Sequence, residues 1–245
     1  MLRKLSIIAV AVSALVLSGC GGSGNGSIIK PELMFVNASP DAGSITYRLN
    51  DEVEAAGLAY SANTPGFVEV DFEGPDVDGY DVSVHSAGGA ELARQAIVFN
   101  QNSDNVVLAH GLVNFAAGEE LKRFRFTTFT VDRQRPVGSK ARLIVVHALE
   151  RGTGTSTPAI RFQNPGDIPQ FQTGGIQSGT TSTLVVDSGP STWIAKRDGA
   201  DGTFATANLN FVAGGVYLII ISGVEGDPLP ANQPKITAVS LPTVL

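Results

Sequence analysis

Cysteine is almost absent from this chain of 245 residues: Cys20 is the single example, and histidine occurs only three times. A single cysteine has no partner for an intrachain disulfide bond. His85, His110 and His147 are not paired at the spacing of metal ligands, and the Gly-x-Ser-x-Gly turn of the α/β hydrolases does not occur. The sequence therefore predicts no metal site, no cofactor and no enzyme.

The chain also lacks an apolar run long enough to cross a membrane. Two positive charges precede thirteen uncharged residues, Leu5 to Leu17, and two small residues follow. At about 1.5 Å per helical residue this run is shorter than the roughly 30 Å hydrocarbon core of a bilayer. The order of charged, apolar and small residues is that of a secretory signal peptide, so we expect residues 1–19 to be removed.

Leu17-Ser18-Gly19-Cys20 closes this segment. These residues resemble the lipobox of bacterial lipoproteins, in which small residues let the processing enzymes reach the backbone. The resemblance implies that Cys20 becomes the first residue of the mature chain and that its thiol carries a lipid. Each buried methylene contributes about 0.8 kcal/mol, so three acyl chains would anchor the protein lastingly to a membrane. In the alternative, an ordinary secreted protein, Cys20 would be one more small residue near the cleavage site.

Glycine and serine dominate the segment after the cysteine, and we interpret residues 20–31 as the lipidated cysteine and a flexible tether. Gly21 stands where, in the lipoproteins that the chain resembles, an aspartate retains the protein at the inner membrane. In a Gram-negative cell, with two membranes, the outer membrane is therefore favoured. Loss of residues 1–19 removes two positive charges and no acid, which moves the net charge from −6 to about −8. Such an acidic chain is a poor binder of nucleic acid.

Two similar halves follow the tether. Four segments of the first half recur in the second half at offsets of 110 to 112 residues. The matched pairs are 33–38 with 143–148, 96–99 with 208–211, 106–111 with 218–223, and 124–126 with 236–238. Ordered matches at a nearly constant spacing indicate a duplication. The sequence predicts a first repeat at 32–131, a polar linker at 132–140 and a second repeat at 141–245.

Alternation of apolar and polar residues indicates β-strands in both halves; from Ser44 to Leu49, for example, every second residue is apolar. Leu218 to Ile221 is apolar throughout, as expected of a central strand that is covered on both faces. Helical periodicity is absent after the signal segment, and only Glu52 to Leu58 is predicted to form a turn or two of helix. About seven strands in each repeat favour an all-β fold of two tandem immunoglobulin-like β-sandwiches.

A single tryptophan and one segment of alternating basic and aromatic residues are candidates for a binding function. Trp193, the single tryptophan, aligns with Tyr80 of the first repeat, and we interpret it as a core residue rather than a ligand platform. Lys122-Arg123-Phe124-Arg125 alternates basic and aromatic residues near the end of the first repeat. We expect a strand with its charged face in water and its phenylalanines inside, rather than a site for nucleic acid or a phosphorylated glycan.

The opening strand of each repeat carries a motif, FVNASPDA at 35–42 and LIVVHA at 143–148. These segments resemble the start of an uncharacterised bacterial cell-surface β-domain, often in tandem, that opens with a hydrophobic strand followed by His-Ala-Ser-Pro-Asp-Ala. The first repeat has Asn37 in place of the histidine, and the second has Leu149-Glu150-Arg151 in place of Ser-Pro-Asp. The resemblance covers nearly all of residues 32–245. It implies a domain of the cell envelope with no established reaction, and it assigns no functional residue.

The departures from this motif bear on its role, because a catalytic motif that needed all these groups would be broken in both copies. We therefore interpret Ser39-Pro40-Asp41-Ala42 as a structural turn. Its proline sets the backbone angle, and its aspartate is expected to accept a local backbone hydrogen bond.

Five acidic residues crowd into eleven positions around Gly79. They are Asp71, Glu73, Asp76, Asp78 and Asp81. Calcium requires six to eight oxygens from such a loop, but the complete calcium-binding loop of EF-hand proteins is missing here. We interpret the cluster as separate turn residues, with calcium binding as the open alternative.

Three functions fit this sequence. The first is a membrane-anchored cell-envelope lipoprotein that acts as a non-catalytic binding or scaffold module for a protein or glycan. The second is an envelope hydrolase with a site between the two repeats. Its mark would be a histidine within hydrogen-bond reach of a serine and a carboxylate in a cleft. The third is a purely structural envelope protein.

Overall fold

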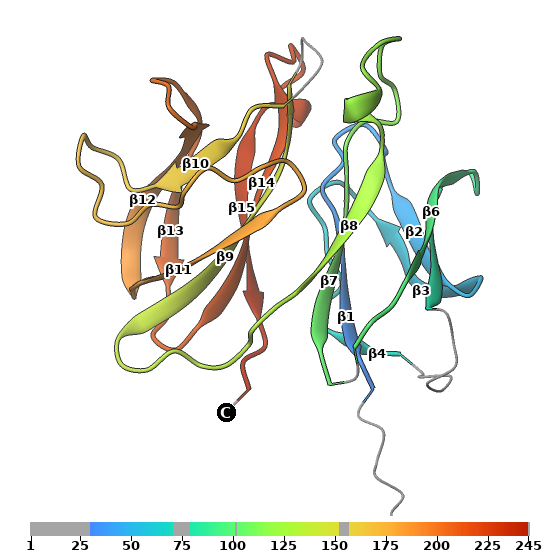
Figure 1. Cartoon of the computed structure of the whole chain (residues 1–245), viewed down its shortest axis with the longest axis horizontal. Helices are drawn as coiled ribbons and strands as arrows, with labels where there is room; N and C mark the ends of the chain where they lie inside the picture. The colour runs from blue at the N-terminus through green and yellow to red at the C-terminus, as the bar shows by residue number, and fades with distance from the viewer. Residues whose placement is uncertain (1–29, 71–78, 101, 152–156, 245) are drawn as a thin grey trace, which may run out of the picture.

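The protein is described here by a computed structural model that covers residues 30–70, 79–100, 102–151 and 157–244 (Figure 1). The first half contains β1 (Glu32–Asn37), β2 (Ile45–Leu49), β3 (Glu52–Leu58), β4 (Val68–Glu69), β5 (Tyr80–Ser86), β6 (Glu91–Ile97), β7 (Asp104–His110), the 3-10 helix η1 (Glu120–Lys122) and β8 (Arg125–Thr130). The second half contains β9 (Lys140–Arg151), β10 (Ile160–Gln163), β11 (Thr181–Asp187), β12 (Gly189–Arg197), β13 (Thr203–Phe211), β14 (Val216–Glu225), the 3-10 helix η2 (Pro230–Asn232) and β15 (Lys235–Leu241). The predicted all-β fold class is confirmed.

Strands β1 to β8, called the first unit below, form two sheets with the strand orders β4-β1-β7-β8 and β3-β2-β5-β6. β1 runs parallel to β7, with Glu32 opposite Asp104 and Asn37 opposite Ala109. The other strand pairs of the unit are antiparallel. Two such sheets packed face to face form a β-sandwich of immunoglobulin-like type.

Strands β9 to β15, called the second unit, repeat this arrangement in the sheets β11-β9-β14-β15 and β10-β12-β13. β9 is again parallel to β14, from Arg142 opposite Val216 to Arg151 opposite Glu225. A 3-10 helix again precedes the last strand, η2 before β15 as η1 before β8. Among the described residues, β3 has no counterpart strand in the second unit, where isolated bridges from β10 to residues 172 and 176 take its place.

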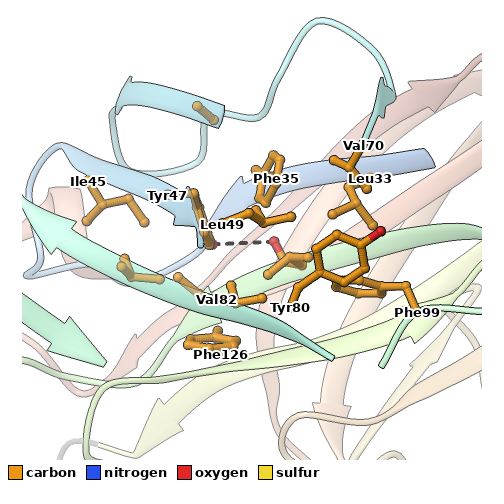
Figure 2. Packing of buried hydrophobic residues seen from close by; sticks show 14 of the residues in the cluster. Leu33, Phe35, Ile45, Tyr47, Leu49, Val70, Tyr80, Val82, Phe99 and Phe126 are labelled. Carbon is orange, nitrogen blue, oxygen red and sulfur yellow. Dashed lines mark hydrogen bonds between the residues drawn. The ribbon is translucent and has the colours of Figure 1, made fainter. Parts of the chain in front are cut away.

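Each sandwich encloses its own apolar core. In the first unit, Phe35 and Tyr47 lie with their ring centroids 4.9 Å apart, and Figure 2 shows them among the aliphatic side chains between the sheets. The Tyr47 hydroxyl donates a hydrogen bond to the carbonyl oxygen of Val36 at 2.7 Å. Burial raises the pKa of this phenol well above its usual value, so it stays a neutral donor.

In the second unit, Trp193 stacks on Phe162 with ring centroids 4.7 Å apart, and its indole N–H donates to Ser191 Oγ at 2.7 Å. It is 1% exposed, which confirms the predicted core role. The predicted alignment of Trp193 with Tyr80 is wrong. Trp193 pairs with Ala207 of β13 and Val82 pairs with Gln95 of β6, and Gln95 and Ala207 correspond at the offset of 112, so Trp193 matches Val82, two residues further along β5.

A third apolar cluster joins the two units and brings the sheets β4-β1-β7-β8 and β11-β9-β14-β15 face to face (Figure 1). Its buried members are Met34, Val36, Ala38, Val106, Leu108, Val131, Ile144, Val146, Ala148, Val216, Leu218, Ile220 and Leu241. Positions 34, 36, 106 and 108 correspond to 144, 146, 218 and 220 at the offsets of the duplication. The same face of each unit is therefore used, as in an isologous dimer.

This interface explains the unbroken apolar run from Leu218 to Ile221. Leu218 and Ile220 point into the interface cluster, whereas Ile219 and Ile221 belong to the core of the second unit. The prediction of a central strand covered on both faces is confirmed.

The predicted helical turn at Glu52 to Leu58 is wrong, because this segment is strand β3. Asn50 and Asp51, both at positive φ (48° and 67°), form the two-residue loop that joins β2 to β3. Two positive φ values are the signature of the type I′ turn, whose twist matches that of a β-hairpin. The turn and the pairing with β2 together outweigh the weak local preference for a helix.

Candidate functional site

The motif turn of the first unit is organised by Asn37 at the end of β1. Its Oδ1 accepts a hydrogen bond from the Ser39 N–H at 3.1 Å, and its Nδ2 donates to the carbonyl oxygen of Gly43 at 2.8 Å. Ser39 Oγ donates to the carbonyl oxygen of Gly111, 2.7 Å away at the end of β7. Asn37 and Ser39 are fully buried. Their polar atoms therefore serve the backbone, in accordance with the predicted structural role of the turn.

Asp41 connects the motif turn to the loop that follows β7. Its carboxylate accepts hydrogen bonds from the N–H groups of Val113 and Asn114 at 2.9 and 2.8 Å. The prediction of a local backbone partner is thus wrong, since these N–H groups lie 72 and 73 positions further along the chain, although the Ser39 hydroxyl also lies 3.4 Å from the Asp41 carboxylate. The parallel pairing of β1 with β7 brings the two loops together, and Asp41 holds the loop after β7 in place.

His147 performs in the second unit the task of Asn37. Its Nδ1 accepts a hydrogen bond from the Leu149 N–H at 3.2 Å, so the proton resides on Nε2, which donates to the carbonyl oxygen of Pro158 at 3.0 Å. Burial lowers the pKa of His147 to about 4, against the smaller opposing effects of the Pro158 carbonyl and Glu150. The neutral imidazole therefore joins two backbone segments through one accepted and one donated hydrogen bond.

Glu150 aligns with Pro40 in the sequence, but it lies in strand β9, which continues to Arg151, whereas β1 ends at Asn37. Its side chain reaches across to the first unit. Its Oε1 lies 3.3 Å from Arg125 Nη2, and its Oε2 accepts a hydrogen bond from Thr157 Oγ1 at 2.8 Å. The carboxylate is only 1% exposed. The prediction of a strand at 122–125 with its charged face in water is therefore wrong for Lys122, which ends η1 and is 1% exposed, and in part for Arg125, which opens β8 and is 35% exposed. Phe124 is buried as expected. Packing of the units covers the end of β8 and supplies a buried partner.

His110 lies beside this ion pair and is fully buried. Its Nε2 is 3.3 Å from Thr127 Oγ1, and its Nδ1 is 3.9 Å from Glu150 Oε1, too far for a hydrogen bond. Burial lowers the pKa of His110, and the nearby Glu150 opposes this effect. A side chain at Gly179 of the second unit would begin 3.3 Å from the imidazole, so the two units are in close contact here.

The second unit has a different residue at the position that corresponds to His110. Ser222 corresponds to His110, and its hydroxyl lies 3.2 Å from the Tyr60 hydroxyl of the first unit. The Lys235 ammonium lies 3.6 Å from the centroid of the Tyr60 ring, and burial lowers the pKa of this lysine. Each side of the interface thus carries a polar contact beside the apolar cluster.

A cleft of about 420 Å³ lies between the two units, at the end of the molecule that carries η1 and η2. Both units line it. Among the first-unit residues are Asp41, Asn114, Phe115 and Glu119, and among the second-unit residues are Arg151, Arg197, Glu225, Asp227 and Asn232. Arg151 corresponds to Asp41 at an offset of 110, so the cleft brings the two ends of the duplicated motif together.

Most charges in the cleft have partners. Arg197 Nη2 forms an ion pair with Glu225, and Glu119 lies 2.8 Å from the Lys122 ammonium. Asp227 accepts hydrogen bonds from the Leu229 N–H at 2.8 Å and from Asn232 Nδ2 at 3.3 Å. Together with the bonded Asp41, each of the four carboxylates of the cleft thus has at least one donor within the protein.

A hydrolase site would need a histidine within hydrogen-bond reach of a serine and a carboxylate in a cleft. Within the described ranges, two histidines meet part of this requirement. His85 Nε2 is 3.0 Å from Ser83 Oγ, but His85 Nδ1 faces the carbonyl oxygen of Gly89 rather than a carboxylate. His110 has Thr127 and Glu150 nearby, but it is fully buried. In the described part of the chain, no histidine joins a serine and a carboxylate in the cleft.

The acidic cluster lies mostly outside the described residues, since Asp71, Glu73, Asp76 and Asp78 fall in 71–78. The remaining member, Asp81, forms an ion pair with Arg94 on the neighbouring strand β6. Within the described ranges, no three His, Cys, Asp or Glu side chains gather in a way that could hold a metal ion.

Cys20, the predicted lipid attachment site, also lies outside the described residues, as does the whole of 1–29. Among the residues that are described, no helix is long and apolar enough to span a membrane.

Sequence reasoning did not assign a role to Glu150 or Arg151, and it placed Arg125 in water. Two of these residues are departures of the second repeat from the Ser-Pro-Asp motif, and that departure was the available signal. A position that holds a turn aspartate in one copy and an arginine in the other cannot make the same backbone hydrogen bonds in both. The structure places these substituted residues at the interface and in the cleft.

No protein-family model and no curated protein matches the chain. Among solved structures, the chain is similar to the crystal structure of "a putative cell adhesion protein from Bacteroides ovatus ATCC 8483". The TM-score is 0.27 and the sequence identity is 10%, over 89% of this chain and 99% of that chain.

Proposed function

We propose that the chain is a membrane-anchored cell-envelope lipoprotein that acts as a non-catalytic binding module, with the cleft between its two units as the binding site. The observation that carries the proposal is the cleft, which both units line. Its volume of about 420 Å³ lies within the range of about 300–1,000 Å³ of small-ligand sites. The facing sheets share a buried apolar cluster, so the walls stand on a rigid scaffold.

The membrane anchor of this proposal rests on the amino-terminal sequence. Lipid on Cys20 would hold the protein at the cell envelope, at the outer membrane in a Gram-negative cell. Residues 20–31 would connect the lipid to β1. The partner bound in the cleft would be a protein or a glycan.

The anchor is tested by Cys20→Ser, with Ser23→Ala in the tether as the matched control. Mass spectrometry of wild type should find a lipid on the cysteine sulfur. The Cys20→Ser protein should fold normally and leave the membrane for the periplasm or medium, while Ser23→Ala stays. An unmodified thiol on exported wild type, or Cys20→Ser protein that resists a carbonate wash, would contradict the anchor.

The binding site is tested by photo-cross-linking on intact cells. A photoreactive amino acid is placed at Ala116, an exposed residue of the cleft, or at Ala96, an exposed residue of β6 outside it. A cross-linked product specific to Ala116 is expected. The same products from both positions, or none from Ala116, would oppose a binding function of the cleft.

A further inference from the structure

Arg151 is the one guanidinium among the described residues of the cleft that has no hydrogen-bond or ion-pair partner within the described chain. Its counterpart Asp41 accepts hydrogen bonds from two backbone N–H groups. An arginine carries only donors and cannot make those bonds. Arg151 ends strand β9, whereas Asp41 lies in the turn after β1, so the second repeat places a positive charge in the cleft.

This charge favours a ligand with a carboxylate. The planar fork of a guanidinium binds a carboxylate through two parallel hydrogen bonds, which are stronger than those between neutral groups. The four carboxylates of the cleft already have donors within the protein, so they leave the Arg151 guanidinium to the ligand.

The other residues of the cleft suit a hydroxyl-rich ligand. The amide side chains of Asn114 and Asn232 offer both donors and acceptors, and the free lone pairs of Glu119 and Asp227 can accept from hydroxyl groups. Phe115 adds an apolar surface that can pack against the C–H face of a sugar ring. One carboxylate together with several hydroxyls on a ring describes a uronic acid.

We propose that the cleft binds an acidic glycan that contains a uronic acid, with Arg151 holding the sugar carboxylate and Phe115 packing against its ring. The inference rests on the proposed function and names the class of ligand. Arg151 acts as the residue that distinguishes acidic from neutral sugars, because an uncharged sugar would leave its guanidinium unpaired.

The test is calorimetric titration of the full mature chain in detergent with digalacturonic acid and with the methyl ester of the same disaccharide. The acid should bind, and the ester should bind about tenfold more weakly or worse, since it lacks the charged hydrogen bonds. Arg151→Gln should lose about the same factor for the acid and little for the ester. Arg135→Gln, an exposed arginine outside the cleft, should match wild type. Thermal unfolding of each variant checks that it is folded.

Equal affinity for acid and ester, or an Arg151→Gln protein that binds the acid like wild type, would overturn the inference, as would no binding of the acid at millimolar concentration. Cross-linking from Ala116 on cells separates this failure from that of the proposed function. If the cleft still captures a partner in Arg151→Gln, and digalacturonic acid does not compete, the cleft is a binding site but its ligand is not an acidic glycan. If Ala116 captures nothing in wild type, the binding function itself fails.

Discussion

At the scale of the residue, Asn37 in the first unit and His147 in the second show why two chemically different side chains can serve at equivalent positions. An amide and a neutral imidazole each offer an acceptor and a donor on one planar group. The amide has a second N–H, and Asn37 Nδ2 also donates to the carbonyl oxygen of Leu58 at 2.9 Å. Each accepts from an N–H two positions later and donates to a carbonyl oxygen beyond the turn. They differ in titration, because only the imidazole can gain a proton near neutral pH.

This difference predicts the effect of His147→Asn on the pH dependence of stability. The pKa of His147 is about 4 in the folded protein and about 6.5 in an unfolded chain. Between these values the unfolded chain binds a proton that the folded protein does not, so the stability that His147 contributes is present above pH 6.5 and is lost as the pH falls toward 4. From pH 7 to pH 5 wild type should lose about 2 kcal/mol more unfolding free energy than His147→Asn. Urea denaturation at both pH values measures this, and equal losses in the two proteins would contradict it.

The ion pair between Arg125 and Glu150 is the second residue-scale feature with a measurable consequence. Arg125→Gln should cost more stability than Glu150→Gln, because it leaves a carboxylate that is 1% exposed, whereas Glu150→Gln leaves a guanidinium that is 35% exposed. We expect about 3 kcal/mol against about 1 kcal/mol. The double variant should lose less than the sum of the two, and additive losses would show that the pair does not interact. Lys140→Gln, which breaks an exposed pair with Asp187, is the control and should change little.

At the scale of the element, both units use a glycine at the carboxyl end of the interface strand. Gly111 follows β7 and Gly223 lies near the end of β14, with φ of 86° and 112°. A Cβ at Gly111 would lie 2.5 Å from the carbonyl oxygen of Arg123, and one at Gly223 would lie 2.5 Å from that of Gln233. The strand and the segment that returns after the 3-10 helix therefore approach more closely than any side chain allows.

Gly111→Ala should accordingly destabilise the protein far more than Gly118→Ala. Both glycines have positive φ (86° and 89°), but a Cβ at Gly118 would meet nothing within 4 Å. Gly118→Ala therefore measures the conformational cost alone, about 1 kcal/mol, whereas Gly111→Ala adds a backbone clash and should cost at least about 2 kcal/mol more. Urea denaturation compares the two variants. Similar losses would mean that the turn around Gly111 can relax.

At the scale of the whole molecule, the apolar cluster between the units should make them unfold together. Burial of this many aliphatic side chains on both faces contributes to the stability of each unit, so neither keeps its full stability when the other is lost. The two units should therefore behave as one cooperative body despite their separate cores.

Trp193 offers a direct test, since the single tryptophan lies in the core of the second unit. Ile45→Ala opens a cavity in the core of the first unit and should cost about 2–5 kcal/mol. In a cooperative molecule this change lowers the urea midpoint reported by Trp193 fluorescence as much as the midpoint reported by circular dichroism. Val53→Ala, at an exposed position of the first unit, should leave both midpoints in place. A tryptophan midpoint unmoved by Ile45→Ala would show independent units.

Particular residues show how far sequence reasoning could reach. The alternation at Ile45, Tyr47 and Leu49 predicted a strand with these side chains inside, and all three are buried. The same reasoning predicted a helical turn for β3, because it overlooked the Asn50-Asp51 turn that pairs this segment with β2. For the candidate site, the sequence predicted only the motif turn and, in the hydrolase alternative, a location between the two repeats. The cleft is lined by the loops after β1, β7 and β14 and by the ends of β9, β12 and β14, whose approach depends on how the two units pack.

The sequence by itself determined the all-β class, because the period of two and the turn residues act over a few neighbouring positions. It also determined the apolar strand that later proved to be covered on both faces. Only the tertiary structure decided that the two units share a buried face, that Glu150 finds its partner in Arg125, and that Asp41 bonds a loop 72 positions away. These contacts join residues far apart in the chain, and their energies depend on burial, which no local pattern specifies.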